Sequence, residues 1–310
     1  MANKPILVHI GYHKTASSWL QANLFEGHGF KKYFAQADIR DRLILPRSFD
    51  FDAADLRAYY DSLVDGDEVS VISNERLCGN PHSGGYDSKE LADRLYASFP
   101  EAKVLIVVRE QLSAILSTYI QYVRVGGPCS IEDYLEPPSR NQSVMPAFDF
   151  AHFDYLPLVK YYYEKFGREQ VLVLPFELFK QDPAEFCSKI TDLVGLPQAQ
   201  DLPYVQAANK RISSSSSIFL RQSNKLFAKT RLNPAASGKK TVRTNKALGG
   251  EGGGYNKIIA LDALIPGFVH DFFDARLKRI IVQKVGDRYQ ASNQELAGLL
   301  DYNLASLDWK

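Results

Sequence analysis

The residues best suited to chemistry lie in one short stretch near the start of the chain, residues 5–21. An apolar run that ends at Gly11 predicts a buried strand, and a helix is predicted to begin near Ser17. One cation and three hydroxyl groups lie around that helix start: Lys14, Thr15, Ser17 and Ser18. Because a helix N-terminus presents unpaired N–H groups and a positive dipole end, the stretch favours a loop that binds phosphate or phosphosulfate. The alternative is a surface turn in which Ser17 or Ser18 caps an ordinary helix.

The pattern excludes one common phosphate-binding loop. The Walker A motif has a glycine directly before its lysine, whereas His13 precedes Lys14 here. The run Lys-Thr-Ala-Ser-Ser-Trp-Leu at 14–20 instead resembles the 5′-phosphosulfate loop of the sulfotransferases, which use 3′-phosphoadenosine 5′-phosphosulfate (PAPS). One residue departs from that pattern, because Ala16 stands where glycine is usual. Alanine disfavours a positive φ, so a turn that needs one at this position would weaken the match.

A second motif follows the clearest predicted strand, residues 103–108. Arg109 comes directly after it, and Ser117 lies eight residues further on, in a predicted helix. Sulfotransferases carry an arginine and a serine at this spacing to hold the 3′-phosphate of the nucleotide. A guanidinium group binds phosphate through two parallel hydrogen bonds, and a hydroxyl group adds a donor. The alternative is an arginine paired with Glu110 beside a serine that faces solvent.

The resemblance implies transfer of a sulfuryl group from PAPS to a hydroxyl or amine, leaving adenosine 3′,5′-bisphosphate (PAP). Lys14 would stabilise charge on the bridging oxygen as the bond to sulfur breaks. The implied binding residues at the 5′ end of the donor are Lys14, Thr15, Ala16, Ser17, Ser18 and Trp19. An acceptor hydroxyl also needs a general base. We predict Glu75, which follows the predicted strand 68–73, with His13 as the alternative base and a simple surface pair with Arg76 as the other interpretation.

The segment 202–250 differs from the rest in charge, because it holds ten basic residues and no acidic one. Such a stretch repels itself unless an anion or an acidic surface offsets the charge, so we expect it to contact the nucleotide, an anionic acceptor, or both. The Arg-Lys-Gly stretch with which many sulfotransferases close over the 3′-phosphate is absent. The candidates to replace it are Arg211, Lys239, Lys240 and the Gly-rich run, and Arg211 is included in the predicted site.

Four short apolar runs alternate with helical patterns, which predicts an α/β fold. With the resemblance, the expectation is a three-layer P-loop-like fold: a central, mostly parallel sheet flanked by helices, with a helical C-terminal part. The chain is predicted to form a single sulfotransferase domain over residues 1–310, in which 202–254 is a basic, Ser- and Gly-rich loop region.

Composition narrows the class of protein. The net charge of +1 argues against a nucleic-acid partner, and the apolar runs are too short to span a membrane. Three widely spaced cysteines indicate neither a disulfide framework nor a zinc site. We therefore predict a cytoplasmic enzyme that needs no metal and acts on a nucleotide donor and a hydroxyl-bearing acceptor, either a glycan or a small molecule. Two alternatives stay open: a non-catalytic anion- or polysaccharide-binding protein, and a P-loop-type kinase.

Overall fold

The computed structural model describes residues 5–136, 148–204, 213–227, 262, 264–300, 302, 304–307 and 309. Packing divides the chain into two compact units. The first comprises Met1–Gln111, Ala151–Val205 and Arg288–Lys310, and the second comprises Leu112–Phe150 and Gln206–Asp287. Because such units can belong to one domain or to two, the expectation of a single domain stays a prediction.

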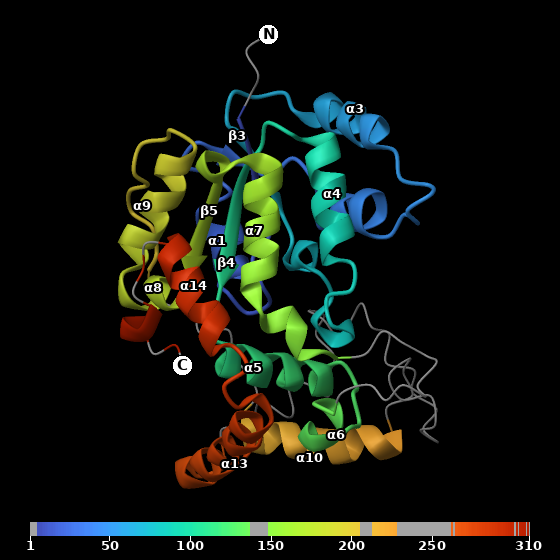
Figure 1. Cartoon of the computed structure of the whole chain (residues 1–310), viewed down its shortest axis with the longest axis vertical. Coiled ribbons are helices and arrows are strands. Elements are labelled where there is room, and N and C mark those ends of the chain that lie inside the picture. Colours follow the sequence, from blue (N-terminus) through green and yellow to red (C-terminus); the bar gives the residue numbers. More distant parts are fainter. Residues whose placement is uncertain are drawn as a thin grey trace. The chain divides into compact units, whose positions relative to one another are not determined.

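The first unit contains a five-stranded sheet, and every strand pair in it is parallel (Figure 1). The strands are β1 (Ile6–His9), β2 (Phe30–Lys31), β3 (Val69–Ser73), β4 (Lys103–Val108) and β5 (Val171–Pro175), in the order β2-β3-β1-β4-β5. The central strand β1 thus has β3 on one side and β4 on the other. The predicted fold class, a parallel sheet flanked by helices, is confirmed.

Helices cover both faces of this sheet and make three layers (Figure 1). One face packs against α3 (Ala53–Leu63), α4 (Ser88–Ser98), α7 (Tyr155–Phe166) and α14 (Gln290–Leu300). The other packs against α1 (Ser17–Asn23), α8 (Phe176–Gln181) and α9 (Pro183–Leu193). Successive strand side chains point to opposite faces, so Val8 joins the first core and Leu7 the second. This two-sided burial explains why the strands are short apolar runs rather than alternating patterns.

Short helical segments complete the first unit. They are α2 (Gln36–Asp38), the π-helix η1 (Ile39–Ile44) and the 3-10 helices η2 (Glu75–Cys78), η3 (Pro81–Ser83), η5 (Arg168–Gln170) and η6 (Leu304–Leu307). A further 3-10 helix, η4 (Phe150–Phe153), spans the boundary between the two units.

The second unit is helical in its described residues. It holds α6 (Ile131–Tyr134), α10 (Ser214–Phe227), α13 (Gly267–Val285) and all but the first residue of α5 (Gln111–Arg124). The side-chain amide of Asn224 on α10 donates to the carbonyl oxygen of Val123 on α5 at 2.7 Å. The serine run lies inside α10, where the Ser214 hydroxyl donates to Asp274 of α13 at 2.8 Å.

Helix α10 begins at Ser214, where the buried serine hydroxyls find partners within the second unit. Helix α14 begins at Gln290. The edge strand β2 has only two residues, Phe30–Lys31. Among the described residues, no helix is long and apolar enough to cross a membrane.

Candidate functional site

The strand order brings the predicted site residues to one edge of the sheet. In parallel sheets, ligands bind at the carboxyl ends of the strands where the direction of winding reverses. Here β2 and β3 lie on one side of β1, whereas the later strands β4 and β5 lie on its other side. The direction of winding therefore reverses at β1. The loop with Lys14 follows β1, Glu75 follows β3 and Arg109 follows β4.

Two residues other than glycine in the loop after β1 have the left-handed backbone conformation that glycine favours. Both Lys14 and Ala16 have a positive φ, +70° and +64°. Ala16 is the N-cap of α1 and makes no side-chain cap. Neither Ser17 nor Ser18 holds the cap position, so the alternative of an ordinary serine-capped turn is wrong. The loop instead stores backbone strain of the kind found at ligand sites. The positive φ at Ala16, where the sulfotransferase loop has glycine, weakens the match to that loop.

Two hydrogen bonds hold this strained loop in place. The buried Thr15 hydroxyl donates to the carbonyl oxygen of Tyr12 at 2.5 Å. Arg109 donates through Nη1 to the carbonyl oxygen of Lys14 at 2.9 Å. Arg109 is itself positioned, because Tyr155 donates to its carbonyl oxygen at 2.7 Å and its guanidinium lies 5.2 Å from the ring centre of Phe176. The arginine at the end of β4 therefore touches the loop at the end of β1.

We expect Ala16→Gly to raise the free energy of unfolding by about 0.5–1 kcal/mol. Removing the strain of a left-handed alanine stabilises the folded state by about 1–2 kcal/mol. The greater conformational freedom of glycine stabilises the unfolded state by about 0.5–1 kcal/mol, which offsets part of that gain. Denaturant unfolding of the purified protein measures the change. Ala58→Gly, on the exposed side of α3, is the matched control and should cost about 1 kcal/mol. Equal losses in both variants would contradict a left-handed Ala16.

Two buried polar atoms lie beneath the loop without partners among the described residues: His9 Nε2 and Ser17 Oγ. The position that a Cβ atom would take on Gly11 lies 2.6 Å from His9 Nε2, 3.0 Å from Ser17 Oγ and 3.0 Å from Thr15 Oγ1. Glycine is therefore needed here for space, and its missing side chain leaves three polar atoms converging on one point. Of the two ring nitrogens of His9, Nδ1 has a hydrogen-bond partner, Ser73, and Nε2 has none among the described residues.

The hydrogen-bond network limits the partners of His9. Gln21 donates through Nε2 to Ser73 Oγ at 2.9 Å, and His9 Nδ1 lies 2.8 Å from the same hydroxyl oxygen. A Ser73 hydroxyl that donates to Nδ1 leaves the ring proton on Nε2, directed at the loop. Burial lowers the pKa of His9 to about 3, so the ring stays neutral at neutral pH. In that tautomer a buried N–H donor lies beneath the loop.

The depressed pKa of His9 predicts acid lability. A histidine that is neutral in the fold and ordinary when unfolded stabilises the protein fully above pH 6.5, and loses this contribution as the pH falls from 6.5 toward 3. Each pKa unit corresponds to about 1.4 kcal/mol. We expect His9→Asn to flatten the decline in unfolding free energy over this range, and His28→Asn, at an exposed position, to leave the decline unchanged. Equal slopes for wild type and His9→Asn would contradict the neutral buried ring.

Glu75 is a half-buried carboxylate beside the loop. Burial raises its pKa, and the charge of Lys14 partly counters the rise. Within the described part of the chain, no hydrogen bond or ion pair engages the Glu75 side chain. The neighbouring Arg76 pairs with Asp87 instead. The alternative of a Glu75–Arg76 surface pair is therefore wrong.

The remaining predicted residues have the following places. Ser18 is exposed, whereas Trp19 donates its backbone N–H to Ala16 within the first turn of α1 and its indole N–H to the carbonyl oxygen of Pro203. Ser117 is buried in α5 and belongs to the second unit. Arg211, Lys239 and Lys240 lie outside the described residues.

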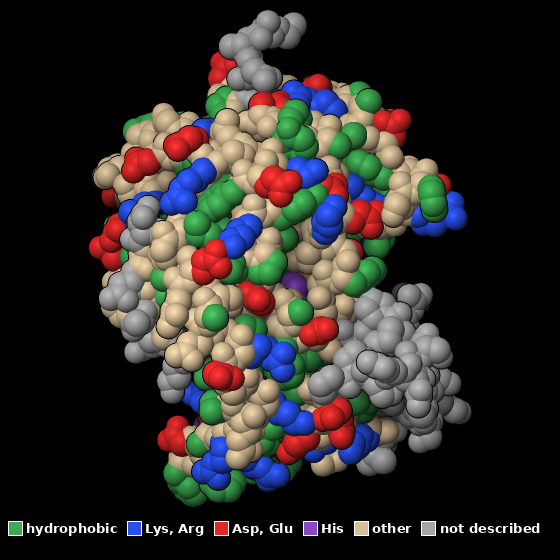
Figure 2. Space-filling view, in the orientation of Figure 1, with side chains coloured by type: hydrophobic (Ala, Val, Ile, Leu, Met, Phe, Trp, Pro, Cys, Tyr) green, Lys and Arg blue, Asp and Glu red, His purple; other side chains and the backbone are tan. Residues whose placement is uncertain are grey.

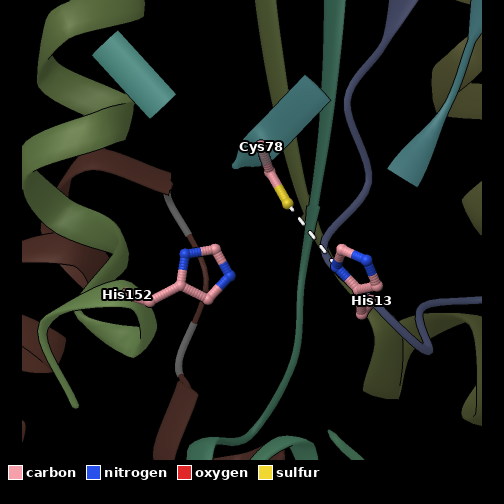
Figure 3. A group of neighbouring side chains, drawn as sticks. All are labelled: His13, Cys78 and His152. Carbon is pink, nitrogen blue, oxygen red and sulfur yellow. Dashed lines mark hydrogen bonds between the residues drawn. The ribbon is translucent and has the colours of Figure 1, made fainter. Parts of the chain in front are cut away.

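His13 lies in a cluster that the sequence did not predict. Its ring is close to the Cys78 thiol of η2 and to His152, which comes more than a hundred residues later (Figure 3). Burial, then the neighbouring His152 and His82, lowers the pKa of His13 well below its usual value. A ring with so low a pKa is a weak proton acceptor at neutral pH, which favours Glu75 over His13 as the base.

Two surface features lie apart from this site. A hollow of about 620 Å³ is lined by residues such as Arg168, Val171 and Lys189, around the amino end of β5 and thus away from the carboxyl edge. Figure 2 shows acidic and basic side chains interspersed over the described surface of the face it draws, rather than a field of one sign.

The solved structures that resemble this chain include two sulfotransferases. One, from Alicyclobacillus acidocaldarius, is 20% identical, with a TM-score of 0.48, covering 72% of this chain and 94% of that one. The other, a mouse sulfotransferase complexed with PAP, is 14% identical, with a TM-score of 0.34, covering 96% of this chain and 89% of that one. No family model and no curated protein matches the chain.

Proposed function

We propose that the protein is a PAPS-dependent sulfotransferase that transfers a sulfuryl group to a hydroxyl or amine acceptor. The observation that carries the proposal is the loop after the central strand, which contains Lys14 and has beneath it two buried polar atoms, His9 Nε2 and Ser17 Oγ, without partners among the described residues. Phosphate oxygens are acceptors and would satisfy Ser17 Oγ, and also His9 in the tautomer with its proton on Nε2. The donor set therefore fits the 5′ end of the nucleotide, which the resemblance implies for this loop.

Arg109 is proposed to hold the 3′-phosphate. Its side chain reaches the loop, since Nη1 is 2.9 Å from the Lys14 carbonyl oxygen, and its guanidinium has the geometry for a second, bidentate contact. PAPS carries a 3′-phosphate and ATP does not, so a site that binds phosphate at both ends of the nucleotide would select PAPS. The proposed contributions of Ser117 and Arg211 stay predictions from the sequence.

Catalysis in this proposal consists of positioning and charge stabilisation. Sulfuryl transfer resembles phosphoryl transfer, whose loose transition state leaves little covalent chemistry to the protein. Lys14 stabilises the negative charge that builds on the bridging oxygen as the bond to sulfur breaks. Glu75 accepts the proton of the acceptor hydroxyl as its oxygen attacks sulfur. Its raised pKa suits this role, because a base works best when its pKa lies near the operating pH.

Binding and turnover with labelled PAPS test the proposal. We expect PAP and PAPS to bind with one site per chain, and the labelled sulfuryl group to move to an acceptor when hydroxyl-bearing glycans and small phenols or alcohols are screened. The kinase alternative predicts tighter binding of ATP with magnesium than of PAP. The non-catalytic alternative predicts salt-sensitive polysaccharide binding with no consumption of PAPS by any acceptor.

A further inference from the structure

The side chains of His13, Cys78 and His152 converge in the first unit from three separate segments. His13 lies in the loop after β1, Cys78 ends η2, and His152 lies in η4 just before α7. One nitrogen of each histidine and the cysteine sulfur all lie within 4.8 Å of one another, and Cys78 Sγ is 3.9 Å from His13 Nδ1. Imidazole nitrogen and thiolate sulfur are the ligands that Zn²⁺ prefers.

His152 points an unpartnered nitrogen into this cluster. Figure 3 shows its Nε2 directed at the space between Cys78 and His13, and within the described residues this buried atom has no hydrogen-bond partner. The ring cannot turn away easily, because it packs against Tyr12 at 5.1 Å and Phe153 at 5.2 Å between ring centres. A buried polar atom held without a partner destabilises the fold, and a bound ligand would remove that penalty.

The backbone around the cluster leaves room for this arrangement. Gly85 has a positive φ of +63°, and a Cβ atom on it would lie 2.3 Å from His152 Nδ1. Any other residue there would push the ring out of place. The Cys78 thiol now donates to the carbonyl oxygen of Glu75 at 3.0 Å, so its sulfur is oriented but holds its proton.

We propose that His13, Cys78 and His152 form a binding site for a thiophilic divalent metal ion, Zn²⁺ or its analogue Co²⁺. On binding, the Cys78 S–H bond breaks, the thiolate joins the metal and one proton leaves to solvent. The fourth position is filled by water or by a group of the protein. A tetrahedral site with Zn–N of about 2.0–2.1 Å and Zn–S of about 2.3 Å needs the ligand atoms to draw closer than they now lie.

The metal would join the loop of Lys14 to η2 and to the segment that leads into α7. Zn²⁺ with one thiolate and two neutral imidazoles has a net positive charge, which would lie directly beside the loop after β1. The site thus has a role separate from proton transfer, and it assigns His13 to metal binding rather than to base catalysis.

Cobalt titration of the full chain, stripped of metal with a chelator, tests the site without any measurement of activity. We expect one Co²⁺ per chain, a thiolate-to-cobalt charge-transfer band in the near ultraviolet, and displacement of the band by Zn²⁺. Cys78→Ser should abolish the band. Loss of a residue that only supports a metal ligand lowers metal affinity by about 10–100-fold. His13→Gln and His152→Gln each remove a ligand, so each should weaken cobalt binding by more than this.

The other two cysteines provide matched controls. Cys187 is buried elsewhere in the first unit and Cys129 is exposed in the second, and substituting either by serine should leave the band unchanged. A band that survives Cys78→Ser but disappears in Cys129→Ser would show an adventitious surface site and overturn the proposal. So would a folded wild-type chain that binds no cobalt. Neither result would bear on PAPS use, which labelled-donor binding measures separately.

Discussion

Lys14→Met is expected to lower the turnover number for sulfuryl transfer by about 10²- to 10³-fold, the usual loss when one charge-stabilising donor is removed from an active site. Lys14 lies in the strained loop at the end of the central strand, and its charge reaches the carboxylate of Glu75. Methionine has a similar length and no charge, so the loop backbone should keep its course. The loss therefore measures the ammonium group itself.

Comparing turnover with PAP binding separates the two roles of Lys14. PAP lacks the sulfuryl group and the bond that breaks, so its affinity should fall by only about 10- to 100-fold, the value of one charged hydrogen bond. Lys31→Met is the control, since Lys31 lies on the edge strand β2 and pairs with Asp65 on the surface. Equal losses in turnover and in PAP affinity would mean that Lys14 binds the donor and does not stabilise the transition state.

Glu75→Gln is expected to lower turnover by about 10²- to 10⁴-fold, the range for loss of a general base, while PAP binds with unchanged affinity. Glutamine keeps the shape of the side chain but cannot accept a proton. The Glu75 carboxylate has no partner in the described part of the chain, so no structural ion pair is broken by the change. Single-turnover kinetics with labelled PAPS and isothermal titration with PAP give the two quantities.

The control for this substitution is Glu101→Gln. Glu101 is also half-buried, but it precedes β4 at the opposite edge of the sheet and pairs with Arg57 at 2.6 Å. Its loss should affect stability slightly and turnover not at all. Normal turnover in Glu75→Gln, together with loss of turnover in His13→Gln that added metal does not alter, would move the base to His13.

The sequence determined the local elements of this protein and the position of the loop. Apolar runs bounded by glycine or charge predicted β1, β3, β4 and β5, because the strands of a parallel sheet are buried on both faces. The succession of strand, lysine, hydroxyl residues and helix predicted the anion-binding loop. The order of chemical groups along the chain is enough for such predictions, since each depends on neighbours within about twenty residues.

The tertiary structure alone decided what surrounds the loop. Periodicity does not encode strand order, and only the order β3-β1-β4 puts Glu75 and Arg109 on either side of Lys14. The strained φ of Ala16 could not be predicted, because local sequence favours the opposite and the packed loop overrides it. The unpartnered His9 Nε2 and the convergence of His13, Cys78 and His152 arise from segments far apart in sequence, which meet only because the sheet and its helices bury their apolar faces together.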